Sequence, residues 1–171
     1  MEILEKMRSS GCLEVGIGIE SGSQRILNTV NKGETVKKNM AAIKMCHKVG
    51  IRIKGFFVVG LPGENEESIR ETEKFLEEAD LNDMDITIFS PYPGSHIYKN
   101  KKNFDIHFKD DYEHAWYKGR PHDYHTTIST SALSSDDILR IRDDLEKRFK
   151  KGIKPEGAHT GMGNESLIDK S

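Results

Sequence analysis

Cysteine is scarce in this chain, with two residues among 171. Two thiols are too few for a disulfide framework or a cysteine-rich metal site, and apolar surroundings predict that Cys12 and Cys46 are both buried. No apolar run approaches the length of a membrane span and no signal peptide opens the chain, so a cytoplasmic protein is expected. A formal net charge of −2 supplies no basic surface, so nucleic acid is not an expected partner.

Metal-binding patterns are also weak. His107, His114, His122 and His125 crowd the segment 104–125, but they are accompanied only by scattered acids. Zinc needs four ligands that converge with tetrahedral geometry, so solvated or packing histidines are the simpler interpretation and no metal site is predicted. The tyrosines of the same segment are compatible with an ordered loop that packs over the end of a sheet.

The composition that remains is that of one globular domain. Hydrophobic residues make up 35% of the chain and charged residues 32%, which suits a protein with a core and a well-solvated surface. After Gly152 the chain contains lysine, proline, glycine, serine and asparagine with almost nothing apolar. We therefore expect one domain over residues 1–152 and a disordered tail over 153–171.

Helical and extended patterns alternate along the first half of the chain. Thr35, Asn65 and Ser134 are good amino-terminal caps, and each precedes apolar residues at helical spacing. These signals predict helices over 2–9, 35–50, 65–79 and 134–149, and strands over 13–20, 51–59 and 84–89. Strands that alternate with helices form right-handed βαβ units, so the chain should build a small parallel sheet covered by helices.

The first predicted strand has two very different faces. Its bulky residues would pack against helices, whereas the other set has glycine at two central positions and a carboxylate at its end: Glu14, Gly16, Gly18 and Glu20. A barrel interior that serves stability alone is layered with Val, Ile and Leu, so glycines there leave room for a ligand. The pattern indicates an arc of sheet with helices outside and a polar concave face lined by small residues. Close packing of the strand against a helix would also explain the glycines.

Three short motifs follow the strands in order. They are GIGIESGS at 16–23, FVVGLPGE at 57–64 and SPYPGS at 90–95. Together they resemble the second half of a radical S-adenosylmethionine (SAM) enzyme, nearest to the cobalamin-binding and methylthiotransferase-like branches. The resemblance runs over about residues 2–149 and is specific because the three motifs occur together at the right spacing. It implies an α/β fold, a parallel-sheet half barrel of the TIM type with about three βα units and a carboxy-terminal helix.

The resemblance also implies roles for individual residues. In such enzymes the first of these motifs contacts the ribose and methionine ends of SAM, and Glu20 and Ser21 fall on those positions. A carboxylate such as Glu20 can accept hydrogen bonds from ribose hydroxyls or from an ammonium group. Arg25 is the first candidate for holding the SAM carboxylate, and Lys32 is the second. The second motif passes its backbone along the adenine edge, and the residues at that position are Val58, Val59 and Gly60.

The chain departs from the family at the iron–sulfur cluster. In the family a 4Fe–4S cluster, held by three cysteines in a CxxxCxxC loop, reduces SAM to start radical chemistry, and this sequence contains no such loop. We therefore expect the carboxy-terminal half of a radical SAM iron–sulfur oxidoreductase, catalytically inactive by itself and with weak or absent SAM binding. Its expected partner is the amino-terminal half of the parent barrel. The resemblance leaves open whether the parent also binds cobalamin.

Other interpretations remain open. A half barrel leaves the strand 13–20 with an unpaired edge, so the chain could be a non-catalytic α/β module that associates with proteins or dimerises through that edge. A sugar- or phosphate-binding barrel fragment would hold an anion at the amino terminus of the helix that follows Glu64. A dinucleotide site is disfavoured, because residues 16–22 do not form a GxGxxG motif at a strand-to-helix turn.

Overall fold

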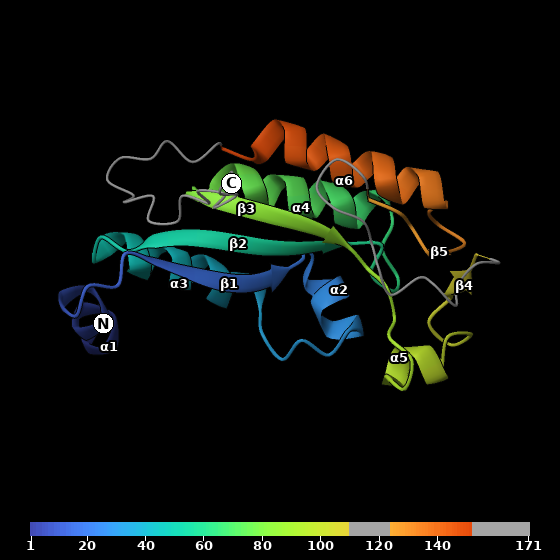
Figure 1. The fold of residues 1–171 in the computed structure, drawn as a ribbon, viewed down its shortest axis with the longest axis horizontal. Coiled ribbons are helices and arrows are strands. Elements are labelled where there is room, and N and C mark those ends of the chain that lie inside the picture. The colour runs from blue at the N-terminus through green and yellow to red at the C-terminus, as the bar shows by residue number, and fades with distance from the viewer. Residues whose placement is uncertain (110–123, 152–171) are drawn as a thin grey trace, which may run out of the picture.

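A parallel three-stranded sheet forms the centre of the computed structural model, which describes residues 1–109 and 124–151. The strands are β1 (Glu14–Glu20), β2 (Arg52–Val59) and β3 (Asp83–Ile88), and they lie in the order β1-β2-β3 (Figure 1). The register of β1 on β2 shifts between Gly18 and Glu20. This shift leaves Ile19 as the extra residue of a β-bulge, which bends the carboxyl end of β1.

Helices begin where the sequence predicts caps. The helices of the described residues are α1 (Glu2–Ser9), α2 (Gln24–Thr29), α3 (Val36–Lys48), α4 (Glu66–Glu78), α5 (His96–Lys99) and α6 (Ser135–Phe149). The side chain of Thr35 caps α3 by accepting from the Lys38 amide at 3.1 Å. Asn65 and Ser134 form reciprocal capping boxes at the starts of α4 and α6, so all three predicted caps are confirmed.

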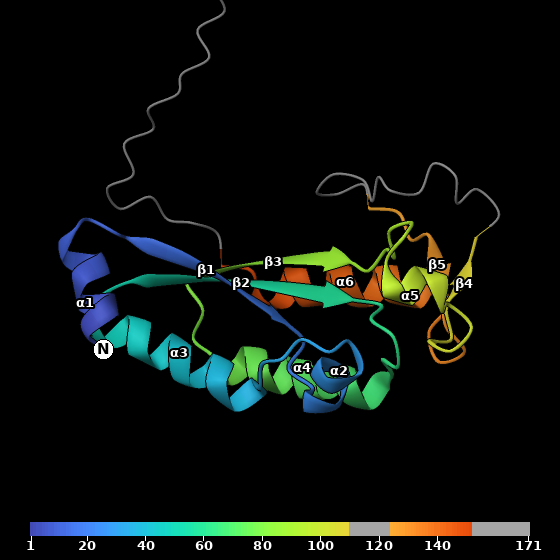
Figure 2. The same ribbon diagram turned by 90° about the horizontal axis from the view of Figure 1, so that it is seen from below.

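The two faces of the sheet have different environments. Helices α2, α3 and α4 lie on one face, and Figure 1 looks onto the other (Figures 1 and 2). Alternate residues of β2 point into the helix layer, where Ile53, Phe57 and Val59 are at most 2% exposed. The residues between them are more exposed and face the open side of the sheet. This alternation places the polar face where the sequence predicts it.

Helix α6 closes one flank of the sheet by packing along β3 (Figure 1). The buried Arg142 donates from Nε to the carbonyl oxygen of Ile86 in β3 at 3.2 Å. Among the described residues, β3 pairs with β2 alone. The same guanidinium pairs with Asp143 and Glu146 and lies 4.0 Å from the ring centroid of Tyr124. These contacts give the outer edge of β3 a side-chain partner.

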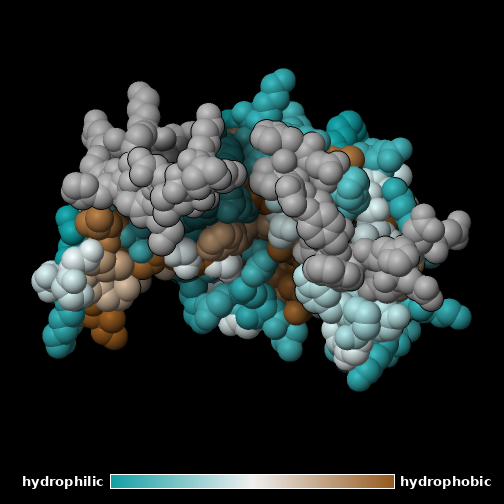
Figure 3. Space-filling view, viewed as in Figure 1, coloured by the Kyte–Doolittle hydropathy of each residue, from teal (hydrophilic) through white to brown (hydrophobic). Residues whose placement is uncertain are grey.

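The opposite flank, at β1, is open. Within the described residues β1 pairs with β2 alone, and Leu13 just before the strand is 61% exposed. Helix α1 lies at this end of the molecule and contains no buried residue, and its Ile3 is 76% exposed. The space-filling view shows the resulting apolar surface over α1 (Figure 3). The unpaired edge that the sequence predicts is therefore present in the described part of the chain.

The predicted fold class is confirmed as an α/β half barrel with a parallel sheet. The sequence missed the short helices α2 and α5 and the antiparallel pair β4 (His107–Phe108) and β5 (Ile128–Ser129). The prediction of two buried thiols is wrong for Cys12, which is half-buried because it lies in the turn between α1 and β1, whereas Cys46 is buried.

Some expectations concern residues outside the described ranges. The tail 153–171 and the histidines His114 and His122 lie there. Across 1–109 and 124–151, none of the helices combines the length and the apolar character that crossing a membrane requires.

Candidate functional site

The carboxyl end of β1 is a strained turn centred on Glu20. Its backbone adopts φ 65°, and the Ser21 amide donates to the Ile19 carbonyl oxygen at 2.8 Å, which closes a three-residue γ-turn. A positive φ is uncommon for a residue with a Cβ and costs about 1 kcal/mol or more. The turn directs the Glu20 carboxylate back over Gly18 on the open face, where a Cβ on Gly18 would lie 3.0 Å from Glu20 Oε1.

Lys32 completes a charge pair at this rim of the sheet. After helix α2, Asn31 adopts φ 52° and the Lys32 amide donates back to the Leu27 carbonyl oxygen at 3.0 Å. The chain then carries the Lys32 side chain to Glu20, where Nζ donates to Oε1 at 2.6 Å. The Lys32 and Glu20 side chains are 30% and 25% exposed, so a ligand can reach both. An ammonium group beside a carboxylate is complementary to a zwitterionic ligand.

The two glycines of β1 make room on the open face, and this chain's own polar and aromatic groups occupy part of that room. The ring of Phe56 lies over Gly16, where an added Cβ would be 2.6 Å from Cε2. The Glu20–Lys32 pair lies over Gly18. The space that the sequence analysis assigned to a ligand is therefore partly taken by an aromatic ring at Gly16 and by an ion pair at Gly18.

Ser21 points in the opposite direction, toward the helix layer. Its buried hydroxyl lies 3.2 Å from the Thr72 hydroxyl of α4 and accepts from the Ser23 amide at 3.1 Å. The Gly22 amide donates to the same threonine at 3.0 Å, and a Cβ on Gly22 would lie 2.6 Å from the Thr72 Cα. These contacts fasten the end of β1 to α4, so the Ser21 side chain supports Glu20 from below.

The side chain of Arg25, a residue of α2, reaches the turn between β2 and α4. Its Nη1 donates to the Gly63 carbonyl oxygen at 2.7 Å and its Nη2 donates to Asn65 Oδ1 at 3.1 Å. The sequence placed Arg25 ahead of Lys32 as the cation beside the ligand. The structure instead brings Lys32 into contact with Glu20, and Arg25 joins α2 to the start of α4.

The carboxyl end of β2 is fixed by its neighbours. Val58 is half-buried on the open face, Val59 is 2% exposed in the core, and Gly60 adopts φ 87°. Gly60 also lies against α6, where an added Cβ would be 3.2 Å from Ile138. The Phe89 amide donates to the Val59 carbonyl oxygen at 2.8 Å. The backbone expected to run along adenine is therefore held on both sides.

Glu64 is a residue of this region whose role the sequence did not reveal. It is 1% exposed, and its Oε2 accepts from the Gly60 amide at 2.6 Å. Burial raises the pKa of Glu64 to about 8, although hydrogen bonds from the Gly60 and Leu61 amides and the charge of Arg25 act in the opposite direction. Its one signal in the sequence is its place at the end of the FVVGLPGE motif, where a carboxylate after a turn is normally read as exposed.

Ion pairs line the open face toward the amino ends of the strands. Lys54 pairs with Asp83 at 3.1 Å and with Asp85 at 2.8 Å, and Lys150 at the end of α6 bonds to Asp85 at 3.0 Å. The hydrogen bond with Asp85 raises the pKa of Lys54. Burial alone would raise the pKa of Asp85, but the hydrogen bonds from the two lysines lower it overall. The charges at this end of the open face are therefore paired, each aspartate with at least one lysine.

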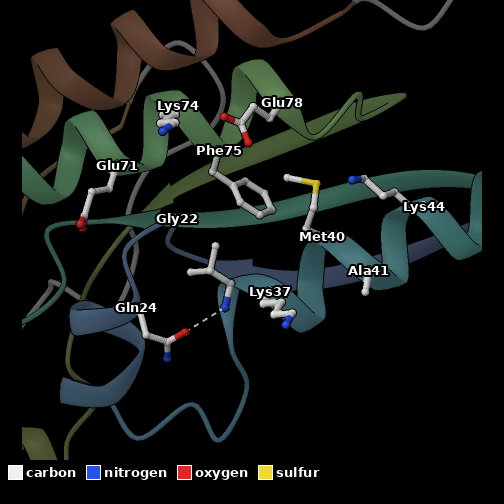
Figure 4. Close-up of a pocket in the computed structure, with 11 residues that line it drawn as sticks. Gly22, Gln24, Lys37, Met40, Ala41, Lys44, Glu71, Lys74, Phe75 and Glu78 are labelled. Carbon is white, nitrogen blue, oxygen red and sulfur yellow. Dashed lines mark hydrogen bonds between the residues drawn. The ribbon is translucent and has the colours of Figure 1, made fainter.

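Two cavities of the described residues differ in position. One of about 320 Å³ lies on the open face across the strands, and its lining includes Glu20, Val58 and Thr87. The other, of about 740 Å³, is a groove between α3 and α4 on the helix side, with Met40 and Phe75 in its lining (Figure 4). Ligands of α/β proteins bind at the carboxyl ends of the strands. The smaller cavity, which contains predicted contact residues, is therefore the candidate site.

An iron–sulfur cluster does not fit the residues present. The sequence contains two cysteines, and the pKa of Cys46 is raised by burial and by the neighbouring Cys12. A raised pKa keeps a thiol protonated, whereas cluster ligands are thiolates. In the part of the chain that the structure describes, no three His, Cys, Asp or Glu side chains are grouped to hold a metal ion.

Similar proteins point to one superfamily. Residues 1–76 match the model of the Radical SAM superfamily. An uncharacterized methyltransferase of Pyrococcus horikoshii is 36% identical over 98 residues, which are 57% of this chain and 21% of that protein. The bacteriochlorophyllide d C-12(1)-methyltransferase of Chlorobaculum tepidum is 28% identical over 153 residues, which are 88% of this chain and 32% of that protein.

The fold is also similar to a solved structure. A radical S-adenosylmethionine methyltransferase of Kitasatospora setae, solved with cobalamin and a 4Fe–4S cluster bound, superposes with a TM-score of 0.58 at 14% identity. The superposition covers 96% of this chain and 38% of that one. The chain spans less than two fifths of the length of each of these three proteins.

Proposed function

We propose that the chain is the SAM-contacting, carboxy-terminal half of a radical SAM iron–sulfur oxidoreductase core, because its residues 1–76 match the model of the Radical SAM superfamily. In the complete core this half contributes contacts to the ribose, adenine and methionine parts of SAM and closes the barrel on the substrate side. The observation that carries the proposal is the backbone of Glu20. A non-glycine residue at positive φ persists where the fold holds it in place, and such residues cluster at binding sites.

Each contact in the proposal has a structural support. Glu20 accepts hydrogen bonds from the ribose hydroxyls or the ammonium group, and Lys32 beside it faces the carboxylate of the methionine end. Ser21 holds the Glu20 turn on α4, and Arg25 holds the turn that follows β2. The backbone of residues 58–60 runs along the adenine edge. Gly18 leaves the space in which Glu20 and Lys32 meet, because a side chain there would press on both groups.

The cluster belongs, in this proposal, to the amino-terminal half of the parent barrel, which is the partner of this chain. The two cysteines present cannot hold it, so the chain by itself runs no radical chemistry and binds SAM weakly. The two relatives described above are named as methyltransferases and another is named as a putative methylthiotransferase, so we propose methyl transfer or methylthio transfer as the reaction of the parent. A cobalamin-binding parent is in keeping with the solved structure of similar fold.

A titration with SAM tests the proposal. In nuclear magnetic resonance spectra of the chain, millimolar SAM should move the amide signals of Glu20 and Val59 selectively. Glu20→Gln should weaken the response, because a neutral amide no longer attracts the ammonium group. Glu14→Gln is the matched control, since Glu14 lies on the same strand and face but pairs with Arg52 at the far end. Signals that stay fixed at millimolar SAM would contradict the proposal.

The open flank supports a second candidate function, association with another protein. β1 has no strand on its outer side in the described residues, and Leu13 and Ile3 expose apolar surface beside it. Unpaired edges accept further strands. In this alternative the chain is a non-catalytic module that pairs through β1, including with a second copy of itself. Light scattering at high concentration separates the cases, since a clean monomer would count against self-association.

A further inference from the structure

The turn from β2 to α4 is built around one buried carboxylate. The Glu64 amide donates to the Leu61 carbonyl oxygen at 3.0 Å, and Gly63 adopts φ 80°, which is the geometry of a turn with proline and glycine at its centre. The Glu64 side chain then folds back beneath the turn and accepts from the Gly60 amide at 2.6 Å. A carboxylate that accepts a bond this short from the backbone restrains the amide that donates it.

Within residues 1–109 and 124–151, the surroundings of Glu64 contain little other charge. Arg25 of α2 is the charged group that acts on it, and its guanidinium is engaged with the Gly63 carbonyl oxygen and Asn65. From α6 the neighbouring side chain at this turn is Ile138, which is apolar and lies against Gly60. The acidic residues of the first turn of α4, Glu66 and Glu67, are exposed. The ionisation of Glu64 is therefore felt chiefly by the backbone that it binds.

We infer that Glu64 is a positioning residue whose carboxylate, through the Gly60 amide, sets the backbone of residues 58–60 and couples its conformation to the protonation state of the carboxyl group. The inference rests on the proposed function in one respect, that residues 58–60 contact SAM. An ionised carboxylate binds an amide more strongly than a neutral carboxyl group does. Ionisation thus strengthens the bond that holds the end of β2 and protonation weakens it, although burial of the charge lowers the stability of the whole fold.

The pKa of Glu64 places this change in an accessible range. Burial raises that pKa to about 8, so the group passes from mostly neutral to mostly ionised between pH 7 and 9. The coupling therefore acts close to neutral pH, unlike that of an exposed carboxyl group, which is ionised throughout this range.

The amide signal of Gly60 tests the coupling without any ligand. In the 171-residue chain it should move with pH along a single curve with a midpoint near 8, because its hydrogen-bond acceptor gains charge. Glu64→Gln, which keeps an acceptor oxygen but cannot ionise, should abolish the movement. Glu71→Gln, an exposed change on the same helix, should leave it intact. A Gly60 signal that does not titrate in the wild-type chain would overturn the inference, and so would one that titrates identically in Glu64→Gln.

A second measurement follows the consequence for the ligand. From pH 6.5 to 9 the affinity of the wild-type chain for SAM, relative to Glu64→Gln, should rise by roughly fivefold, the lower end of usual coupling between sites. The comparison with Glu64→Gln removes the titration of the SAM amino group from the result. Equal pH profiles in the two proteins would refute the coupling to the ligand site. Absence of SAM binding in both would contradict the proposed function, and the Gly60 signal would still decide the role of Glu64.

Discussion

The ends of β1 and β2 are alike in sequence and opposite in environment. β1 ends at Glu20 with φ 65°, Gly60 directly after β2 has φ 87°, and both motifs contain a carboxylate. At β1 the carboxylate is Glu20, which is partly exposed and paired with Lys32. At β2 it is Glu64, which is buried and bound to a backbone amide. One acid is accessible on the open face, and the other is buried and holds the backbone of the turn.

The comparison shows that the acid of such a motif can be exposed on the sheet or buried under a turn. Which of the two occurs depends on whether the acid itself or a glycine adopts the positive φ. At β1 the acid itself occupies the strained position, so its side chain turns onto the open face. At β2 a glycine takes that position without strain, and the acid four residues later is left to fold underneath. Each of the following predictions tests one part of this contrast.

Replacing Glu64 or Glu20 by alanine should change the free energy of unfolding by very different amounts. Glu64→Ala at pH 6 should lower the free energy of unfolding by about 3 kcal/mol, because it leaves a cavity and strands the Gly60 amide. Glu20→Ala should cost less than about 1 kcal/mol, since it removes one partly exposed ion pair. Chemical denaturation of both variants measures the two values. Equal losses would remove the contrast.

The pH dependence of stability should come from the buried acid. The pKa of Glu64 is about 8 in the folded chain and near 4.5 when unfolded, so the folded state holds the proton over a wider range. Its contribution to stability is complete below pH 4.5 and is lost as the pH rises to 8, at up to roughly 1.4 kcal/mol per pH unit. The difference in unfolding free energy between wild type and Glu64→Gln should therefore fall over this window. A difference that does not change with pH would show that Glu64 is not a buried acid.

Exchange of the residues at positive φ should give effects of opposite sign. Gly60→Ala should destabilise the chain by about 2 kcal/mol, because alanine disfavours the left-handed region and its Cβ would press on Ile138. Glu20→Gly should be neutral or stabilise by up to about 1 kcal/mol, since glycine adopts the same φ without strain. Thermal unfolding of the two variants and of the wild-type chain measures both changes in stability. A destabilising Glu20→Gly would mean that the ion pair outweighs the strain.

Removal of the surface cation should have the smallest effect on stability. Lys32→Met keeps the apolar stem and should change the free energy of unfolding by less than about 0.5 kcal/mol. SAM-induced shifts at Glu20 should nevertheless weaken. Lys38→Met, which breaks the more exposed pair with Glu34, is the control and should leave those shifts unchanged. The same loss of response in both variants would indicate a general effect of charge.

Much of the fold could be predicted because local signals agree with it. Capping residues and apolar periodicity placed the longer helices and the three strands to within about two residues. The superfamily match over residues 1–76 contains the first two of the three motifs, and the solved structure is similar in fold. Helix α2 was missed because six residues give no usable periodicity, and the pairing of β4 with β5 depends on segments far apart in sequence.

The candidate site was less predictable, because tertiary contacts decide it. Glu20 could be singled out from its place at the end of a strand with glycines. That Lys32 and not Arg25 meets it depends on how the chain turns after α2, and Arg25 finds its partners 38 and 40 residues away. The Gly60 amide that Glu64 binds lies against Ile138 of α6, which is 78 positions later in the chain. Composition and the spacing of motifs do not predict contacts between residues so far apart in the chain.

Helix α6 along β3 has a consequence for assembly. With Arg142 bonded to Ile86 on that flank, growth of the sheet by added strands is confined to the side of β1. Two copies joined edge to edge at β1 would therefore each present a sealed end, and the assembly would stop at a pair.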